Sequence, residues 1–94
     1  MKLENKAVNI NLLQEECAEL IQALSKLRRF PIDFINPENG VCNRDSLIQE
    51  MADVRVFMNA IEDDYNITEA EIEAAMIKKE LKLEKFYVTQ WDLS

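Results

Sequence analysis

Apolar residues recur at helical spacing along three long stretches of this chain, and this periodicity restricts the possible folds more than any other feature. Turn-forming residues are scarce, because the 94 residues include only one Gly and two Pro, too few for an all-β domain. At this length we expect one domain, residues 1–94, with a limited hydrophobic core of its own. We therefore predict an all-α fold with three main helices in a bundle, whose four-helix-bundle-like core is completed by oligomerisation.

Breaks in the periodic pattern separate the three helices. The first helix is expected over about residues 4–27 and to stop near Arg29, because Pro31 disfavours helix in the residue before it. An irregular connection follows at residues 30–45, where Asn-Pro and Asn-Gly pairs mark turns. A shorter break lies at residues 63–66.

Capping residues predict where the second and third helices begin. Asp45 or Ser46 is expected to cap the second helix. Thr68 followed by Glu71 forms a capping-box pattern at the start of the third helix. The third helix is expected to fade before Trp91.

Acidic residues outnumber basic ones by 18 to 11, which gives a formal net charge of -7. Such a charge does not suit a surface that neutralises phosphates along a nucleic acid, so we expect no nucleic-acid partner. Two Cys and no His provide no zinc-binding set and fit a reduced, cytoplasmic setting in which Cys17 and Cys42 are free thiols. Charged and amide residues interrupt the amino terminus, so we expect a soluble protein without signal peptide or membrane span.

Carboxylates inside the apolar stripes are the most informative feature of the first two helices. At about 100° per residue, Glu16 falls within the apolar sector of the first helix and Glu19 at its edge. Glu50 projects from the middle of the second helix's stripe, and Asp53 lies beside it. Each helix therefore carries two carboxylates one turn apart on the face expected to pack.

Packing these two faces together would bring four carboxylates into a partly desolvated space. Like charges at such distances cannot all remain ionised without a cation. Oxygen ligands suit a hard divalent cation, and the lack of His argues against zinc. We therefore predict a Mg²⁺ site, with Mn²⁺ as a possible substitute, formed by Glu16, Glu19, Glu50 and Asp53.

The third helix carries the complementary charge. Lys79 and Lys82 both project from its apolar face. In phosphate sites, Mg²⁺ commonly bridges carboxylates and substrate phosphates while cationic side chains hold the remaining phosphate oxygens. The two lysines are therefore predicted to bind substrate.

Each of these charges also has a simpler interpretation. A helical EExxE run is commonly a solvated face, and a lysine can lay its methylenes along the core edge with its ammonium in water. Glu50 alone could be a buried acid paired with Arg28, Arg44, Arg55 or Lys79. The conjunction of acids on two helices and bases on the third favours a shared site.

The strings EECAE at residues 15–19 and EMAD at residues 50–53 resemble the EExxE and ExxD half-motifs of the MazG-like all-α nucleoside triphosphate pyrophosphohydrolases. The similarity covers about residues 12–83, and the segment between the half-motifs is longer than in many members. The resemblance implies Mg²⁺ ligands at Glu16, Glu19, Glu50 and Asp53, and a basic pair on the following helix at Lys79 and Lys82.

This resemblance implies hydrolysis of a nucleoside or deoxynucleoside triphosphate to the monophosphate and pyrophosphate. Bound metal would lower the pKa of the attacking water, and Glu15 or Glu19 would take its proton. A homodimer or homotetramer is also expected, because the protomer is small and its helices carry apolar residues around much of their circumference.

The contrasting hypothesis is a non-catalytic acidic helical module that docks an amphipathic partner or senses nucleotides without turnover. A docking module predicts outward-pointing carboxylates and no need for metal. The sequence alone leaves the base preference open. It also leaves the connection at residues 30–45 either as part of nucleobase recognition or as an irregular cover.

Overall fold

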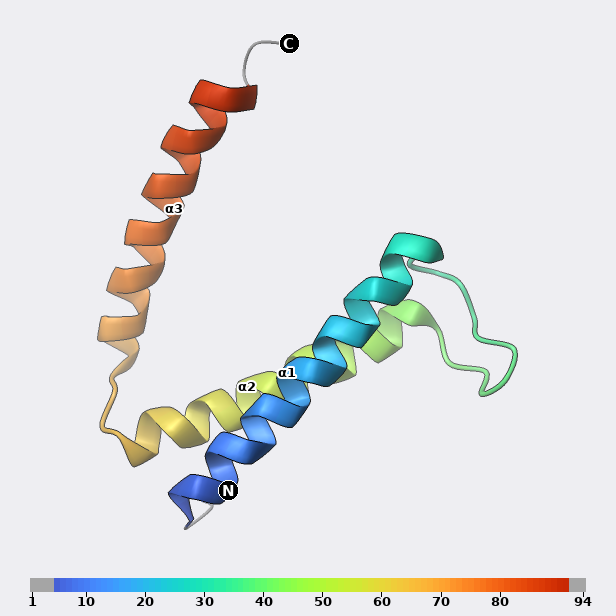
Figure 1. Cartoon of the computed structure of the whole chain (residues 1–94), viewed down its shortest axis with the longest axis horizontal. Helices are drawn as coiled ribbons and strands as arrows, with labels where there is room; N and C mark the ends of the chain where they lie inside the picture. Colours follow the sequence, from blue (N-terminus) through green and yellow to red (C-terminus); the bar gives the residue numbers. More distant parts are fainter. Residues whose placement is uncertain (1–4, 92–94) are drawn as a thin grey trace.

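The computed structural model describes residues 5–91, and side chains as far as residue 86. Three helices make up this part of the chain: α1, Lys6–Arg29; α2, Asn43–Asp64; and α3, Glu69–Trp91. The predicted all-α fold is confirmed, and α1 and α2 form an antiparallel pair from which α3 leads away (Figure 1). None of the helices in the described range has the length and apolar character needed to cross a lipid bilayer.

Both ends of α1 follow from local signals. The side chain of Asn5 accepts a hydrogen bond from the Val8 N–H at 3.1 Å and so caps the helix. At the other end, the backbone of Phe30 is extended before Pro31, as predicted, and its N–H donates to the Lys26 carbonyl at 2.8 Å. The predicted start near residue 4 lies outside the described residues.

The connection between α1 and α2 is an ordered loop that closes on itself. Ile35 and Cys42 form an isolated antiparallel bridge. Inside it, the Asn36 N–H donates to the Val41 carbonyl at 2.9 Å, and the Gly40 N–H donates to the Asn36 carbonyl at 2.7 Å. Gly40 has a φ of 71°, which glycine adopts without steric cost. This loop therefore holds the adjoining helix ends in a defined relation.

The loop also starts α2 earlier than expected. The helix begins at Asn43, so the predicted cap at Asp45 or Ser46 is wrong. The reason is that loop carbonyls satisfy the first donors of the helix. The Asn43 N–H donates to the Phe34 carbonyl at 2.9 Å, and its buried side-chain amide donates to the Pro31 carbonyl at 3.0 Å.

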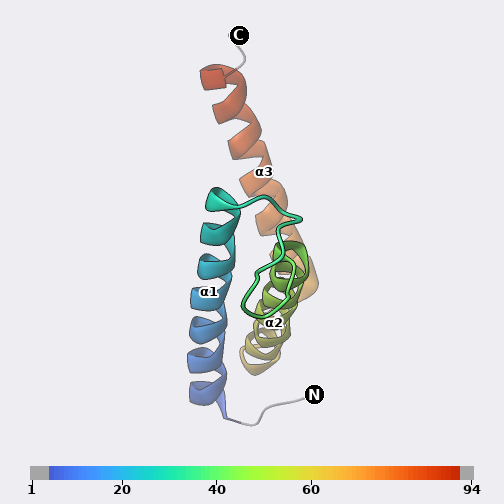
Figure 2. The same cartoon turned by 90° about the vertical axis from the view of Figure 1, so that its right-hand side faces the viewer.

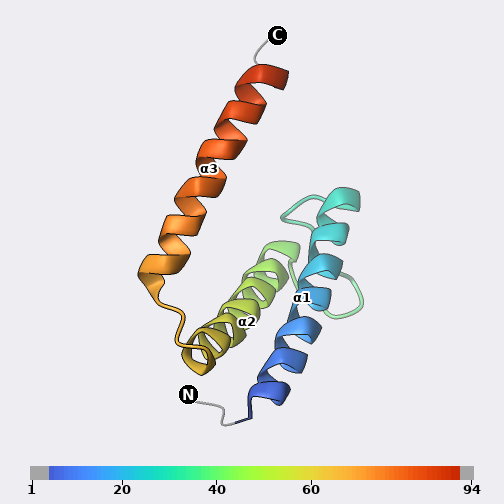
Figure 3. The ribbon, with the colours of Figure 1, turned by 60° about the vertical axis from the view of Figure 1, so that its left-hand side comes forward.

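α1 and α2 lie side by side (Figure 3), and they pack through the faces that carry the acids. Ala23 is the buried apolar residue of the described range. The larger apolar side chains of the two faces are half-buried: Leu12, Leu13, Leu20, Leu27, Leu47, Val54, Phe57 and Ile61. At the end opposite the loop, the completely buried Asn9 donates from Nδ2 to Asp64 Oδ2 at 2.8 Å. The helix pair is thus tied together at both ends.

A short turn leads from α2 into α3. Asn66 has a φ of 55°, a left-handed conformation that asparagine tolerates better than most residues. The predicted capping box is confirmed, because the Glu71 N–H donates to Thr68 Oγ1 at 3.2 Å and the Thr68 N–H donates to Glu71 Oε2 at 2.8 Å. The helix continues to Trp91, beyond its predicted end.

α3 stands apart from the helix pair. Across the described residues, α1 and α2 are the two helices whose backbones approach each other (Figure 2). The radius of gyration is 17.1 Å, against about 12 Å for a compact chain of this length. The described part of the chain is therefore a helix pair with a separate third helix, and not a closed three-helix bundle.

The sequence of α3 explains this difference from the expected bundle. α1 and α2 direct their acid-bearing faces toward each other. α3 exposes apolar side chains on two sides, with Met76 and Leu83 on one and Ile77 and Leu81 on the other. A helix that is apolar on both sides needs more than one neighbour to cover it.

Candidate metal centre

Four carboxylates from two helices meet between α1 and α2. Glu16 and Glu19 come from α1, and Glu50 and Asp53 from α2. Each offers one oxygen atom, and these four atoms all lie within 4.8 Å of one another. The i, i+3 spacing on each helix places both acids of a pair on one face, one turn apart. The structure thus brings together the four acids that the sequence pattern singled out.

Burial of the carboxylate oxygens distinguishes this group from an ordinary acidic surface. Glu16, Glu50 and Asp53 are half-buried, whereas Glu19 is exposed. The Oε2 atoms of Glu16 and Glu50 are buried and have no hydrogen-bond partner among the described residues. A buried polar atom without a partner is costly, so these two oxygens point to a ligand that would satisfy them.

The electrostatics of the group lead to the same conclusion. Burial raises the pKa of Glu16, and the neighbouring Glu19, Asp53 and Glu50 raise it further. Burial likewise raises the pKa of Glu50, with further increases from Glu19 and Asp53 and a smaller opposing effect of the Lys26 ammonium. The carboxylates therefore resist ionising together, and a cation among them would relieve this repulsion.

The donor set fits a hard divalent cation. All four side chains offer carboxylate oxygens, the ligands that Mg²⁺ and Mn²⁺ prefer. Within the described range the group contains no cysteine, and the chain has no histidine, so the softer ligands typical of zinc are missing. Cys17 and Cys42 are free thiols, as predicted. One ligand is already oriented, because Gln49 Nε2 donates to Asp53 Oδ1 at 2.8 Å.

Three other residues predicted for the site lie elsewhere in the chain. Glu15 is exposed and outside the group of four acids. Lys79 and Lys82 are exposed on α3, whose backbone does not approach α1 or α2. The structure of one chain therefore does not bring the two lysines to the acids, because α3 leaves the helix pair at the end of α2 (Figure 1).

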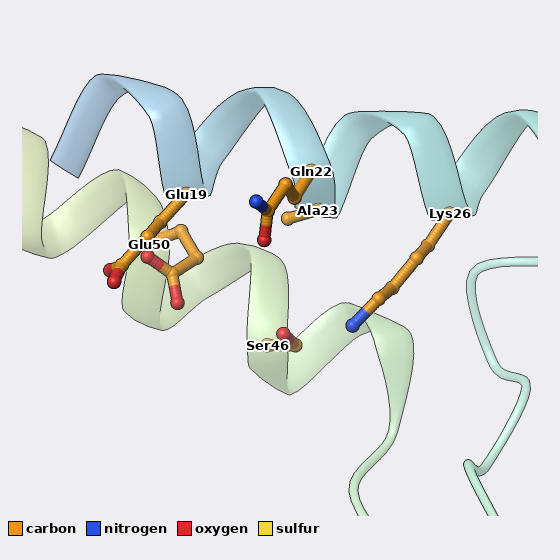
Figure 4. Close-up of a pocket in the computed structure, with 6 residues that line it drawn as sticks. All are labelled: Glu19, Gln22, Ala23, Lys26, Ser46 and Glu50. Atoms are coloured by element: carbon orange, nitrogen blue, oxygen red, sulfur yellow. The ribbon is translucent and has the colours of Figure 1, made fainter. Parts of the chain in front are cut away.

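A different lysine lies beside the acids, and the sequence analysis missed it. α1 and α2 border an open pocket of about 230 Å³ that is lined by Glu19, Gln22, Ala23, Lys26, Ser46 and Glu50. Lys26 reaches from α1 toward the first turns of α2, across the pocket from the two carboxylates (Figure 4). Its position seven residues after Glu19, two helical turns along the same side, is the sequence signal that could have revealed it.

Comparisons with known proteins match no family model, no curated protein and no solved structure to this chain. The MazG-like resemblance therefore stays a prediction, and the geometry of the four acids is what indicates a function.

Proposed function

We propose that this protein is a Mg²⁺-dependent nucleotide pyrophosphohydrolase that converts a nucleoside or deoxynucleoside triphosphate to the monophosphate and pyrophosphate. The observation that carries the proposal is the convergence of four carboxylates, two of which have buried oxygens without a partner among the described residues. An acidic docking module would direct its carboxylates outward, whereas Glu16, Glu50 and Asp53 are half-buried between two helices. This inward orientation favours the metal-dependent enzyme over the non-catalytic alternative.

The residues of the group divide the work according to their exposure. Glu16, Glu50 and Asp53 would hold the ion from the interior, and Glu19 from the solvent side. When bound, Mg²⁺ would position the triphosphate and polarise the phosphorus under attack. Glu19 is better placed than Glu15 to accept the proton of the attacking water, because Glu19 belongs to the group and is exposed.

The proposed reaction is a simple displacement at the α-phosphorus. The water oxygen forms a new bond to this phosphorus while one of its protons passes to the Glu19 carboxylate. The bond between the α-phosphorus and the α,β-bridging oxygen breaks, and its electron pair leaves with pyrophosphate. The proton then returns from Glu19 to solvent, which restores the carboxylate.

A single substitution tests the proposal. Glu50→Gln removes one charge from a half-buried ligand while keeping its shape, so Mg²⁺-dependent pyrophosphate release from a panel of nucleotides should be abolished. Glu38→Gln, an exposed position in the loop, is the matched control and should retain activity. Circular dichroism checks that both variants are folded. Turnover by Glu50→Gln at the control rate would contradict the proposed role of this centre.

We also propose that the active form is a homodimer or homotetramer. The chain exposes 7933 Å², whereas a compact monomer of its mass would expose about 5,600 Å². The excess of about 2,300 Å² per chain would give an interface in the size range of obligate oligomers. We take the partner to be a second copy of the same chain, because identical chains are present wherever the protein is.

One side of the protomer suits such an interface. By helical periodicity, Glu19 and Asp53 lie on one side of the α1–α2 pair. Several exposed apolar residues lie on the opposite side. We call this second side the apolar face, and it consists of Ile21, Leu24, Ile48, Met51 and Met58, continued by Met76 in a groove of about 650 Å³ between α2 and α3. A partner covering the apolar face would leave the acids accessible. Light scattering at micromolar concentration that gave only monomer would contradict this assembly.

A further inference from the structure

The pocket beside the carboxylates has two chemically different ends. Glu19 and Glu50, which belong to the four-acid group, form one end, and the side chain of Lys26 forms the other (Figure 4). Gln22 and Ser46 lie between them, one on each helix (Figure 4). Ala23 contributes only a methyl group, which leaves the space between the helices open. A ligand in this pocket would touch both the metal ligands and a cation.

The donor groups of this pocket are not used by the protein itself. Among the described residues, the Lys26 ammonium forms no ion pair and no hydrogen bond, although its charge acts on Glu50. The side chains of Gln22 and Ser46 have no hydrogen-bond partner in the same range either. Ammonium, amide and hydroxyl groups can all donate hydrogen bonds. Three side chains able to donate to an anion therefore line one pocket next to a candidate cation site.

The residues that line the pocket indicate which part of a nucleotide it would bind. A base is usually held by apolar or aromatic surfaces with a few polar contacts, and this lining contains no aromatic ring and only Ala23 as an apolar residue. Phosphate oxygens instead require cations and hydrogen-bond donors, and a lysine is a common partner for them. The pocket is therefore suited to the phosphate chain.

We infer that this pocket binds the β- and γ-phosphates of the substrate, the part that leaves as pyrophosphate, with Lys26 as its cationic ligand and Gln22 and Ser46 as neutral donors. This inference rests on the proposed function, because the four acids would have to hold the Mg²⁺ ion on which the hydrolysis depends. It assigns to Lys26, within a single chain, the role that the sequence analysis gave to Lys79 and Lys82. The leaving group would thus lie on the Lys26 side of the metal centre.

Inorganic pyrophosphate is the direct probe of this pocket. Its affinity is measured by titration calorimetry in the presence of Mg²⁺ for the wild type, Lys26→Gln, Lys26→Arg and the control Lys78→Gln, which loses the same charge on α3. Loss of a charge-assisted hydrogen bond should weaken pyrophosphate binding by Lys26→Gln about 10- to 100-fold. Lys26→Arg should retain most of the affinity, and Lys78→Gln all of it. Lys26 is exposed, so the fold should persist in each variant.

A second titration separates this inference from the proposed function. Binding of Mn²⁺ alone reports on the four acids, and Lys26→Gln should bind it no more weakly than the wild type does. Equal pyrophosphate affinity in Lys26→Gln and Lys78→Gln, with Mn²⁺ binding and nucleotide hydrolysis intact, would overturn the pocket assignment alone. If Lys26→Gln instead weakened inhibition by the nucleoside monophosphate product, the pocket would hold the nucleoside and the inference would fail. A wild-type protein that bound no Mn²⁺ would overturn the metal centre and this inference together.

Discussion

The α1–α2 pair and α3 are built from similar amphipathic sequences but have different relations to the rest of the chain. α1 and α2 are tied together by the loop at one end and by the Asn9–Asp64 hydrogen bond at the other. α3 is joined to the pair by one short turn and makes no backbone approach to α1 or α2 within the described range. The comparison indicates that the candidate metal centre belongs to the pair, whereas α3 leaves its apolar sides uncovered in the single chain.

The placement of charge follows the same division. In the pair, acids occupy the inner faces of both helices and are partly buried where the helices meet. In α3, Lys79 lies between Met76 and Leu83 on an apolar side that is exposed in the single chain. The Lys79 ammonium can reach water in the single chain, but a molecule that covered this apolar side of α3 would bury it. The four acids therefore meet within one chain, whereas the apolar sides of α3 are exposed in it.

The largest expected effect compares an acid of the pair with a lysine of α3. Glu16→Gln should lower the affinity for Mn²⁺ at least about a hundredfold, since even groups that only support metal ligands contribute tenfold to a hundredfold. Lys79→Gln should leave the affinity for Mn²⁺ unchanged, because α3 does not approach the acids in the chain. Titration calorimetry measures both. A large loss of Mn²⁺ affinity in Lys79→Gln would show that α3 reaches the four acids. The proposed difference between α3 and the helix pair would then be wrong.

The next effect concerns assembly. Met76→Asp places a charge in the groove between α2 and α3, where the apolar face is expected to meet a second copy. Burying an unpaired charge is costly, so the dissociation constant of the oligomer should rise at least about tenfold. Met76→Leu, which keeps the apolar character, is the control. Analytical ultracentrifugation over a concentration series measures this dissociation constant. An unchanged value in Met76→Asp would show that Met76 on α3 is not part of the interface.

Stability should depend on pH in opposite directions in the two regions of the chain. The pKa values of Glu16 and Glu50 are raised in the folded chain, so their contribution to stability is complete below the ordinary value of 4.5 and is lost as the pH rises through the raised values. The pKa of Glu71 is lowered by its hydrogen bonds to Thr68, so its contribution is present above 4.5 and is lost as the pH falls.

Thermal unfolding between pH 4 and pH 8 measures these contributions. In the metal-free protein, Glu16→Gln should remove part of the decrease in Tm between pH 5 and neutral pH. Glu71→Gln should instead reduce the decrease in Tm that occurs as the pH falls toward 4. Saturating Mg²⁺ should reverse the decrease, because the ion stabilises the ionised carboxylates of the folded state. Identical profiles for the wild type and Glu16→Gln would show that the four acids do not repel one another.

The smallest effect comes from the two side-chain caps. Asn5→Ala removes the cap of α1 and Thr68→Ala removes the cap of α3. Each should cost about 1 kcal/mol, which corresponds to a decrease in Tm of about 4–8 °C for a domain of this size. If Asn5→Ala alone lowers the Tm, α3 unfolds independently of the pair. Equal decreases would show that α3 is part of the same cooperative unit, as the proposed assembly requires.

The features that sequence reasoning predicted are those that depend on local spacing. The three helices follow from apolar periodicity, and the capping box at Thr68 and Glu71 follows from two residues three positions apart. The meeting of Glu16 and Glu50 follows because both lie on stripes that pack against each other. The first two inferences need only the geometry of a helix, whereas the third also needs the two stripes to pack against each other.

The features that it missed depend on contacts between distant parts of the chain. α2 starts at Asn43 because loop carbonyls 9 to 12 residues earlier accept its donors. Lys26 lies at the exposed edge of its helix, so only the presence of α2 turns it into the wall of a pocket. The position of α3 was missed because periodicity gives the apolar sides of a helix without saying which chain covers them.

The self-contained loop between α1 and α2 has a consequence for how such centres diversify. Its tip, from Asn36 to Val41, is closed by its own hydrogen bonds beyond the Ile35–Cys42 bridge. Residues added or removed at the tip would therefore leave the alignment of α1 against α2 intact, since surface turns tolerate changes of length. A change in the number of residues between the two acid pairs would thus leave the acids together, whereas a change in the i, i+3 spacing within a pair would turn one acid away from the shared face.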